Sequence, residues 1–243
     1  MARRVSLLRR LSELEPPIDD PENALAENRV TVDGAIVTNP RSQVLPDARI
    51  VVKPRSELRG VRKLGPALDA FGVEVNGAVA VDLGACTGGF TQVLLARGAV
   101  RVFAVDVGHG QLLGSLRQDD RVVNLERTNV AEVTPTLLGC RPDVIVCDIT
   151  KLPLREVARQ LVDNDVPMPG THLVGLVKPM FELGIGELPE AEGLARALAL
   201  AERGIEELGW ADVSSIDSTI LGHRGAVEYF LHARWPEGPA GPS

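Results

Sequence analysis

The segment AVAVDLGACTGGF, residues 78–90, decides the fold of this chain. Its first half is a short apolar run that ends in an acid, Asp82, and it is typical of a buried strand in a parallel sheet. A run of small residues follows, Gly84 to Gly89, and the apolar segment 90–98 after it predicts a helix. A strand, a glycine-rich turn and a helix in this order form the first unit of an open α/β sheet in which the turn holds a ligand.

The segments on both sides of this unit continue the alternation of strands and helices. Strands are expected at 100–108, 121–126, 143–148, 172–179, 211–220 and 226–235, and helices at 63–72, 111–119, 130–139, 154–164 and 190–209. Such alternation predicts an α/β fold of the Rossmann-like type, with a doubly wound, mostly parallel sheet of seven strands. The last two strands have no helix between them, so they suit an antiparallel pair at one edge.

The N-terminal part follows a different pattern. Apolar residues at helical spacing predict a helix over 1–15, and a second short helix is expected over 20–27. The segment 29–37 alternates around an Asp-Gly pair, which is a strong hairpin signal, and 48–53 is another short strand. We therefore expect a small α+β module over 1–53, a linker over 54–61, the large domain over 62–235 and a tail over 236–243.

Charge is distributed unevenly over the 243 residues, whose formal net charge is −7. Residues 1–63 hold 12 Lys and Arg against 9 Asp and Glu, whereas residues 64–243 hold 14 against 24. A basic head on an acidic body is the pattern of an interaction module. An excess of three charges is also small enough to arise by chance, and the charge pattern alone leaves both interpretations open.

The three cysteines, Cys86, Cys140 and Cys147, form neither a disulfide framework nor a zinc-ligand pattern. They suit a reducing cytosol, so we expect a cytoplasmic protein. No apolar run approaches the roughly 20 residues of a membrane span, and the basic start lacks the long apolar core of a signal peptide. We expect no contact with a membrane.

The glycine-rich turn limits the ligands that the large domain can hold. The spacing G-x-x-x-G-G is not the G-x-G-x-x-G of a dinucleotide site, and Asp82 would repel a pyrophosphate. A Walker loop is excluded because no G-K-[ST] is present. An acid before the turn favours a ligand with positive charge, such as the sulfonium and amino group of S-adenosylmethionine. A second acid, Asp106, ends the next strand and can bind ribose hydroxyls.

Four charged residues mark the other side of the site. Asp148 and Lys178 end two strands, Glu228 lies early in the last strand, and Lys63 begins the first helix of the large domain. Lysine is almost never fully buried without a partner, so a lysine at the end of a buried strand needs an explanation. For either strand-end residue alone, an ion pair at the rim of the sheet would suffice. Together the four can form an alternating network around a hydroxyl group.

At these residues the sequence resembles the TlyA-type (hemolysin A family) RNA 2′-O-methyltransferases, within the FtsJ-like group. The resemblance rests on DLGACTGGFTQVLLARGAVRVFAVDVGHGQL, LRQDDRVVNLERTNV and LVKPMFELG, and it runs through most of residues 62–233. It implies a class I methyltransferase that uses S-adenosylmethionine and no metal, with rRNA or a ribosomal subunit as its partner. It also implies that residues 1–53 form an S4-like RNA-binding module.

The resemblance carries site residues onto this sequence. It implies a catalytic tetrad of Lys63, Asp148, Lys178 and Glu228, in which Lys178 accepts or steers the proton of a ribose 2′-hydroxyl and Asp148 orients Lys178. The residues implied to bind the cofactor are Asp82, Gly84, Ala85, Cys86, Thr87, Gly88, Gly89, Phe90, Asp106, Val107, Thr128, Asn129 and Asp148.

Several departures from the family pattern lie on the acceptor side. Asp148 is followed by ITKLP rather than by the family's Leu-Ser-Phe-Ile-Ser, and the second helix of the small module has become the acidic IDDPENALAEN. Acids in an RNA-binding surface weaken phosphate contacts. Two alternatives to an rRNA acceptor therefore stay open: methylation of a small molecule in secondary metabolism, and a non-catalytic RNA-binding protein, against which the intact tetrad counts.

Three further features carry simpler interpretations. His109 is expected to line the methyl-donor pocket, and Cys86 is expected to be a small spacer in the turn because no Cys–His nucleophile pair is visible. The linker arginines Arg55, Arg59 and Arg62 suit either contacts to RNA phosphates or solvated linker charges.

Overall fold

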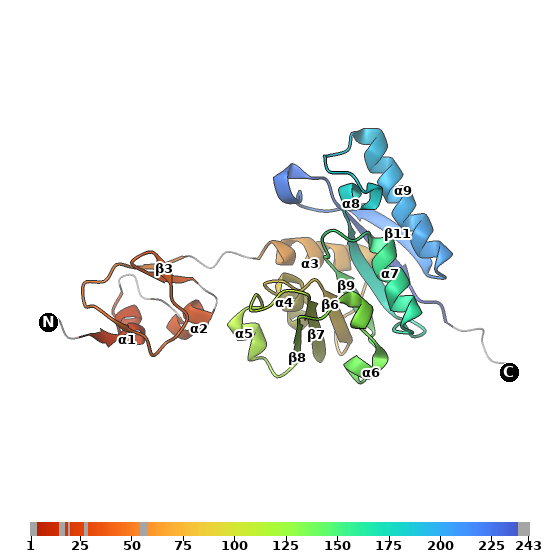
Figure 1. Cartoon of the computed structure of the whole chain (residues 1–243). Coiled ribbons are helices and arrows are strands. Elements are labelled where there is room, and N and C mark those ends of the chain that lie inside the picture. The colour runs from red at the N-terminus through yellow and green to blue at the C-terminus, as the bar shows by residue number, and fades with distance from the viewer. Residues whose placement is uncertain (1–3, 15–17, 19, 27–28, 54–57, 238–243) are drawn as a thin grey trace. The chain divides into compact units, whose positions relative to one another are not determined.

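The computed structural model of the chain describes residues 4–14, 18, 20–26, 29–53 and 58–237. It divides into two compact units (Figure 1). The first comprises residues 1–57 with 113–119, and the second comprises residues 58–112 and 120–243. Residues 54–57 of the expected linker and residues 238–243 of the expected tail lie outside the described part.

The smaller unit combines short helices with short antiparallel strands. Its elements from residues 4–53 are β1 (Val5–Ser6), α1 (Leu7–Ser12), α2 (Pro21–Ala26), β2 (Val30–Val32), β3 (Ala35–Ile36), β4 (Gln43–Val44) and β5 (Ile50–Val52). Strand β2 lies between β3 and β5, and β1 pairs with β4. The core is made of Leu7, Leu11, Ala24, Leu25, Val30 and Val44.

The hairpin expected over 29–37 is present. Asp33 and Gly34 connect β2 to β3 with φ of 50° and 85°, the positive values that a tight two-residue hairpin turn requires. The helix expected over 1–15 is shorter than predicted: among the residues described there, only Leu7–Ser12 is helical, and Val5 pairs with Val44 as a strand. Helical spacing of apolar residues could not reveal this pairing, because the partner strand lies some 40 residues further along the chain.

The larger unit alternates strands and helices as predicted. Its strands are β6 (Val79–Leu83), β7 (Arg101–Asp106), β8 (Val122–Glu126), β9 (Val144–Cys147), β10 (His172–Val177), β11 (Ala211–Asp217) and β12 (Tyr229–Arg234). The helices of the chain beyond residue 58 are α3 (Arg59–Phe71), α4 (Gly89–Ala96), α5 (Gly114–Arg117), α6 (Pro135–Leu138), α7 (Leu154–Asp163), α8 (Pro179–Leu183) and α9 (Ala191–Glu207). None of the helices described is long and apolar enough to cross a membrane.

These boundaries differ from the expectations in several places. The helix expected over 111–119 is shortened to Gly114–Arg117, and Glu228, expected early in the last strand, lies one residue before β12. Helix α3 begins at Arg59, so residues 59–61 of the expected linker are helical, and Gly72 ends the helix with φ 64° as predicted. The helix expected over 130–139 is a 3₁₀ turn (Val130–Glu132) followed by α6, because Pro135 starts a new helix at its first position. The short helix α8, directly after Lys178, was not expected.

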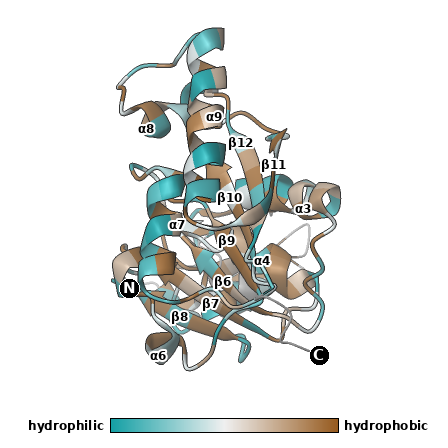
Figure 2. Ribbon diagram, turned by 90° about the vertical axis from the view of Figure 1, so that its right-hand side faces the viewer, coloured by the Kyte–Doolittle hydropathy of each residue, from teal (hydrophilic) through white to brown (hydrophobic). Residues whose placement is uncertain are grey.

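The sheet confirms the predicted seven-stranded, mostly parallel architecture. Its order is β11-β12-β10-β9-β6-β7-β8, and β12 runs antiparallel to both of its neighbours. Figure 2 shows α7 and α9 on one side of the strands and α3 and α4 on the other, with hydrophobic residues concentrated along the central strands. The carboxyl ends of β6, β7, β9 and β10 therefore meet at one edge of the sheet, where ligands bind in open α/β folds.

Candidate functional site

The turn after β6 depends on backbone shapes that favour glycine. Gly84 has φ 84°, and a Cβ atom there would lie 2.8 Å from the carbonyl oxygen of Asp148. Gly88 has φ 96° and caps the start of α4. Cys86 also takes a positive φ, 48°, which is uncommon for a residue with a side chain. The turn thus brings its backbone close to the end of β9 and holds its own amides in a fixed orientation.

Asp106, at the end of β7, fixes this turn from the neighbouring strand. One carboxylate oxygen accepts a hydrogen bond from the Cys86 amide at 2.8 Å, and the other accepts one from the Gly108 amide at 2.6 Å. An ionised carboxylate offers about four acceptor positions, so two remain for the hydroxyls of a ligand. Asp106 can therefore organise the turn and bind a ribose at the same time.

A cavity of about 640 Å³ opens beside the turn, and we name it the turn cavity. Seven of the residues implied to bind the cofactor line it: Gly84, Cys86, Asp106, Val107, Thr128, Asn129 and Asp148. Its volume lies within the range of small-molecule and cofactor sites. The cavity also contains residues that the sequence did not single out: Leu83, Val105, Gly108, Gln111, Val130, Ile149, Thr150, Lys151 and Leu152.

Asp82 is completely buried and does not line the turn cavity. One of its oxygens accepts a hydrogen bond from the Thr91 hydroxyl at 2.6 Å, and the other has no hydrogen-bond partner in the structure. Burial raises the pKa of Asp82 to about 7, and the hydrogen bond from Thr91 opposes this shift. Burial of this carboxyl group therefore favours its protonated form.

The remaining turn residues implied to bind the cofactor, Ala85, Thr87, Gly88, Gly89 and Phe90, do not line the turn cavity. Gly89 faces α3 instead, since a Cβ atom there would lie 2.9 Å from the Cα of Gly60. Phe90 is buried and packs against Phe230, with ring centroids 6.1 Å apart. These two residues are explained by the packing of α4.

On the other side of Asp148, the sheet presents two ion pairs. The amine of Lys178 lies 2.5 Å from a carboxylate oxygen of Asp148, and it donates to the carbonyl of Ile149 at 3.0 Å. The amine of Lys63 lies 2.5 Å from a carboxylate oxygen of Glu228, and both side chains are 8% exposed. All four residues of the predicted tetrad are thus present as two neighbouring pairs.

The register of the sheet explains why the pairs meet. Val177 lies opposite Tyr229 at the end of the antiparallel β10–β12 ladder. Lys178, which follows β10, and Glu228, which precedes β12, are therefore neighbours just beyond this end. Asp148 follows β9, the parallel neighbour of β10. Gly222 allows Glu228 to turn inward, because a Cβ atom at Gly222 would lie 2.2 Å from the Glu228 carboxylate.

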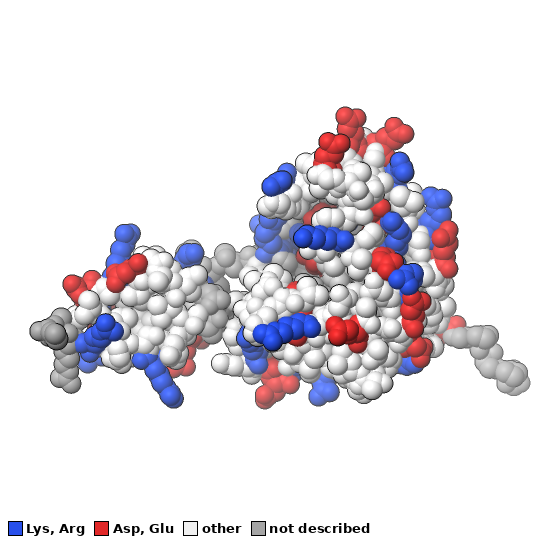
Figure 3. All heavy atoms as spheres, viewed as in Figure 1, with Lys and Arg blue, Asp and Glu red and all other residues white. Residues whose placement is uncertain are grey.

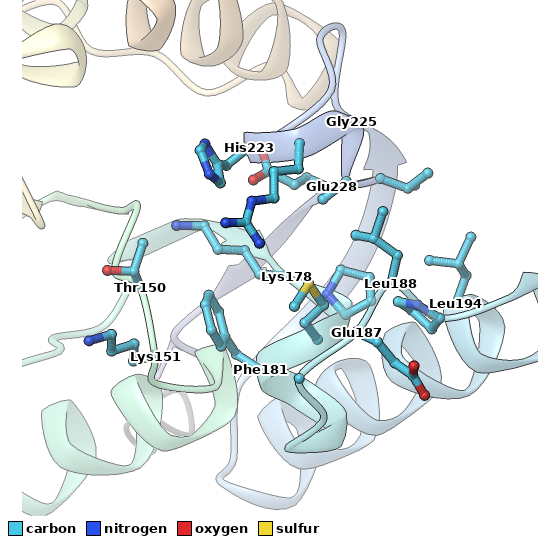
Figure 4. A pocket seen from close by; sticks show the side chains of 17 residues that line it. Thr150, Lys151, Lys178, Phe181, Glu187, Leu188, Leu194, His223, Gly225 and Glu228 are labelled. Carbon is cyan, nitrogen blue, oxygen red and sulfur yellow. The ribbon is translucent and has the colours of Figure 1, made fainter.

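Lys178 and Glu228 line a second cavity of about 610 Å³, which we name the lysine cavity (Figure 4). Apolar side chains from α8 and the following loop form one part of its wall, among them Met180, Phe181 and Leu188. Thr150 and Lys151 line both cavities, so the two sites adjoin at the loop after Asp148. A ligand in the turn cavity can therefore meet a second ligand beside Lys178.

The structure also places the residues that carried simpler interpretations. His109 does not line the turn cavity; its ring lies 3.2 Å from the Glu126 carboxylate. Cys86 does line the cavity, with its sulfur 3.3 Å from the Gln111 side-chain oxygen. Arg59 donates to the carbonyl of Leu221 at 2.6 Å, and Arg55 lies outside the described residues.

The residues that sequence analysis missed lie mainly in loops. Gln111, Thr150 and Lys151 carry no motif of their own, and the segment 223–225 reaches the lysine cavity from between β11 and β12. These residues lie close in the sequence to Asp106, Asp148 and Glu228, and this closeness was the one sequence signal for them. It does not show which neighbouring residues line the cavities.

The distribution of charge on the surface does not by itself mark the functional site. Figure 3 shows basic and acidic side chains interspersed over one face of the larger unit, with acids gathered where α9 begins. In the described part of the chain, no group of three or more His, Cys, Asp or Glu side chains is placed to hold a metal ion. The cavities and the paired charges, rather than a broad patch, define the site.

Comparison with known proteins gives consistent results. A model of the family described as FtsJ-like methyltransferase matches residues 57–235. The chain is 40% identical over 220 residues to the 16S/23S rRNA (cytidine-2'-O)-methyltransferase TlyA of Mycobacterium tuberculosis, covering 86% of this chain and 81% of that protein. It is 32% identical to Hemolysin A of Brachyspira hyodysenteriae, covering 84% and 88%. The solved structure of a protein from Streptococcus thermophilus, assigned as a hemolysin, matches with a TM-score of 0.71 at 26% identity, covering 98% and 91%.

Proposed function

Because this chain belongs to the TlyA/hemolysin A family, with an FtsJ-like methyltransferase domain, we propose that it methylates the ribose 2′-hydroxyl of a cytidine in rRNA. S-adenosylmethionine is the methyl donor of the reaction. The observation that carries the proposal is the position of the two ion pairs, Lys178–Asp148 and Lys63–Glu228, beside a cavity that adjoins the glycine-rich turn.

The turn cavity fits the cofactor. Asp106 keeps acceptor capacity for the two ribose hydroxyls, and the close approach at Gly84 lets a ligand lie against the backbone. Asp148 lines the same cavity, where its carboxylate would offer negative charge to a sulfonium. When bound, S-adenosylmethionine supplies an electrophilic methyl group.

The tetrad prepares the acceptor. The Lys178 amine is held by Asp148 and by the Ile149 carbonyl, so it has a fixed direction into the lysine cavity. There it accepts or orients the proton of the 2′-hydroxyl and directs an oxygen lone pair at the methyl group. Glu228, whose charge is balanced by that of Lys63, binds the acceptor from its position just before β12. Alignment of the two ligands supplies much of the rate.

We assign residues 1–53 to RNA binding, as an S4-like module that brings the enzyme to a ribosomal subunit. The two-helix and hairpin arrangement around the Leu7 and Leu11 core supports this assignment. Exposed cations are available on it at Arg4, Arg9, Arg41, Arg49 and Lys53. Such charges favour a polyanion through counterion release.

The proposal is tested by incubating the protein with methyl-labelled S-adenosylmethionine and either ribosomal subunits, naked rRNA or a mixture of small molecules. We expect label in rRNA, and we expect it at the 2′-oxygen, which makes the adjoining phosphodiester resistant to alkaline hydrolysis. Label that enters small molecules only would favour the alternative acceptor. Cofactor binding without any transfer would favour the non-catalytic alternative.

A further inference from the structure

Two cations beside Lys178 sit on unusual backbone. Lys151 has φ 69° and Arg224 has φ 55°, both in the left-handed region that residues with side chains rarely adopt. Such positions cost free energy and persist only where the surrounding structure holds them, and they cluster at functional sites. Here the loop after β9 and the loop before β12 each place a long basic side chain at the wall of the lysine cavity.

The loop that carries Arg224 is held in place from several sides. Arg59, at the start of α3, donates to the carbonyls of Leu221 and Gly222 at 2.6 and 3.4 Å. The Thr219 hydroxyl donates to the carbonyl of Arg62 at 2.8 Å. The Gly222 amide donates to the carbonyl of Ala226 at 2.7 Å. Arg224 therefore lies in a turn that these hydrogen bonds hold in place, and this turn leads into Glu228.

Charge balance makes these two cations distinctive. Within the tetrad, Lys178 is paired with Asp148 and Lys63 with Glu228, so the four residues contribute no net charge. The Lys151 and Arg224 side chains are exposed, and in the described part of the chain neither forms an ion pair or a side-chain hydrogen bond. They supply the excess positive charge next to the place where the acceptor oxygen must lie.

The arrangement around Lys178 is two-sided. In Figure 4 the Lys178 side chain extends between Thr150 and Lys151 on one side and His223 on the other. Two acids line the cavity: Glu228 is paired with Lys63, and Glu187 lies toward α9 and points away from Lys178 in this view. Because β10 lies between β9 and β12, the loops that carry Lys151 and Arg224 come from the strands on either side of the one that precedes Lys178.

We propose that Lys151 and Arg224 bind the two backbone phosphates that flank the acceptor ribose, one on each side of Lys178. This inference rests on the proposed function, because only a nucleotide within a strand has a phosphate on both sides of its ribose. The pair would position the 2′-hydroxyl over the Lys178 amine and would discriminate against free nucleosides. Neither residue takes part in proton transfer in this proposal.

The test uses Arg224→Gln and Lys151→Gln in the full-length protein, with Arg203→Gln as a matched control, since Arg203 is an exposed arginine of α9 that lines neither cavity. The rate of rRNA methylation is measured against RNA concentration at several salt concentrations. We expect each Gln variant at 151 or 224 to raise the KM for rRNA several-fold and to lessen the slope of log(kcat/KM) against log[salt] by about 1. Arg224 lines the lysine cavity only, so Arg224→Gln should leave the affinity for S-adenosylmethionine unchanged.

A second variant separates binding from folding. Arg224→Gly removes the charge and relieves the left-handed backbone, so its thermal midpoint should stay equal to wild type or rise while the KM for rRNA still increases. Arg224→Lys should restore most of the affinity. Direct binding of a short oligoribonucleotide, with its salt slope, gives a readout that does not depend on methyl transfer.

The outcomes are distinct. If wild-type protein methylates rRNA but the variants at 151 and 224 match Arg203→Gln in KM and salt slope, the phosphate contacts are wrong and the proposed function stands. If wild-type protein transfers no methyl group to rRNA and oligoribonucleotide binding is equal in all variants, both are wrong.

Discussion

Lys63 and Glu228, which lie 165 positions apart in the sequence, form an ion pair of 2.5 Å with both side chains 8% exposed. Helix α3 supplies the lysine, and the residue just before β12 supplies the glutamate. A buried pair of this kind fixes one arrangement of its two elements, because neither charge has water as an alternative partner. It ties the first helix of the domain to the strand that lies beside Lys178.

Breaking this pair should destabilise the fold more than breaking an exposed one. We expect Glu228→Gln to lower the free energy of unfolding by about 3–5 kcal/mol, because it leaves a buried ammonium without a counter-charge. The double variant Lys63→Met/Glu228→Leu should recover most of that loss. Urea titration measures both, with Asp163→Asn as the control, since Asp163 belongs to an exposed pair with Arg159 that should be worth about 0–1 kcal/mol. Equal losses at Glu228 and Asp163 would contradict this interpretation.

Asp82 should make stability fall as the pH rises from about 4 to 7. Its folded pKa of about 7 lies above the ordinary value of 3.8, so the folded state binds the proton more tightly. The stabilisation is fully present below about pH 4 and is lost as the pH rises through the folded pKa, at about 1.4 kcal/mol for each unit of separation. Asp82→Asn keeps an acceptor for Thr91 and should remove this slope. An unfolding free energy with the same pH dependence in both proteins would show that Asp82 is ionised throughout.

His232 should make stability fall as the pH is lowered, the opposite of the effect of Asp82. Burial, and to a smaller extent the charge of the neighbouring His172, lowers the pKa of His232 to about 4. A lowered histidine pKa gives stability that is present above about pH 6.5 and is lost as the pH falls toward the folded pKa. His232 stacks on Phe71, with centroids 5.2 Å apart, so His232→Phe should keep the packing and remove the acid sensitivity. Thermal melts at pH 5 and pH 7 would reveal the difference, and an unchanged difference would rule the residue out.

Gly84 should tolerate no side chain. Gly84→Ala places a methyl group 2.8 Å from the Asp148 carbonyl and also forces alanine to φ 84°. Gly72→Ala is the control, since Gly72 has φ 64° with nothing within 4 Å of the added atom. We expect Gly72→Ala to cost about 1 kcal/mol from backbone strain alone, and Gly84→Ala to cost more and to weaken cofactor binding. Calorimetry of both variants checks this order.

The sequence predicted the sheet and the turn because these depend on strands whose carboxyl ends must meet, whereas the role of the tetrad was implied by the family resemblance. Asp148 and Lys178 follow the carboxyl ends of the neighbouring strands β9 and β10, whereas Glu228 joins them because the antiparallel strand β12 begins at the same edge. Packing across the fold could not be predicted in the same way. Gly89 faces Gly60 and Phe90 faces Phe230, and no local pattern indicates either contact.

Two other features depend on tertiary structure alone. Asp82 sits in a motif that favours a ligand contact, yet the structure surrounds it with the sheet and Thr91. Arg224 lies in a segment without a motif, and its position at the lysine cavity follows from hydrogen bonds to α3, which lies some 160 residues earlier in the chain.

The most direct test of the central claim is methyl transfer to rRNA by Lys178→Met, which keeps the length of the side chain and removes its amine. Asp106 and the turn are untouched, so binding of S-adenosylmethionine, measured by calorimetry, should stay close to wild type. We expect the single-turnover rate of rRNA 2′-O-methylation to fall by about 10²–10⁴-fold, the usual contribution of a positioned proton acceptor. A Lys178→Met variant that methylates rRNA at the wild-type rate would contradict the role of Lys178.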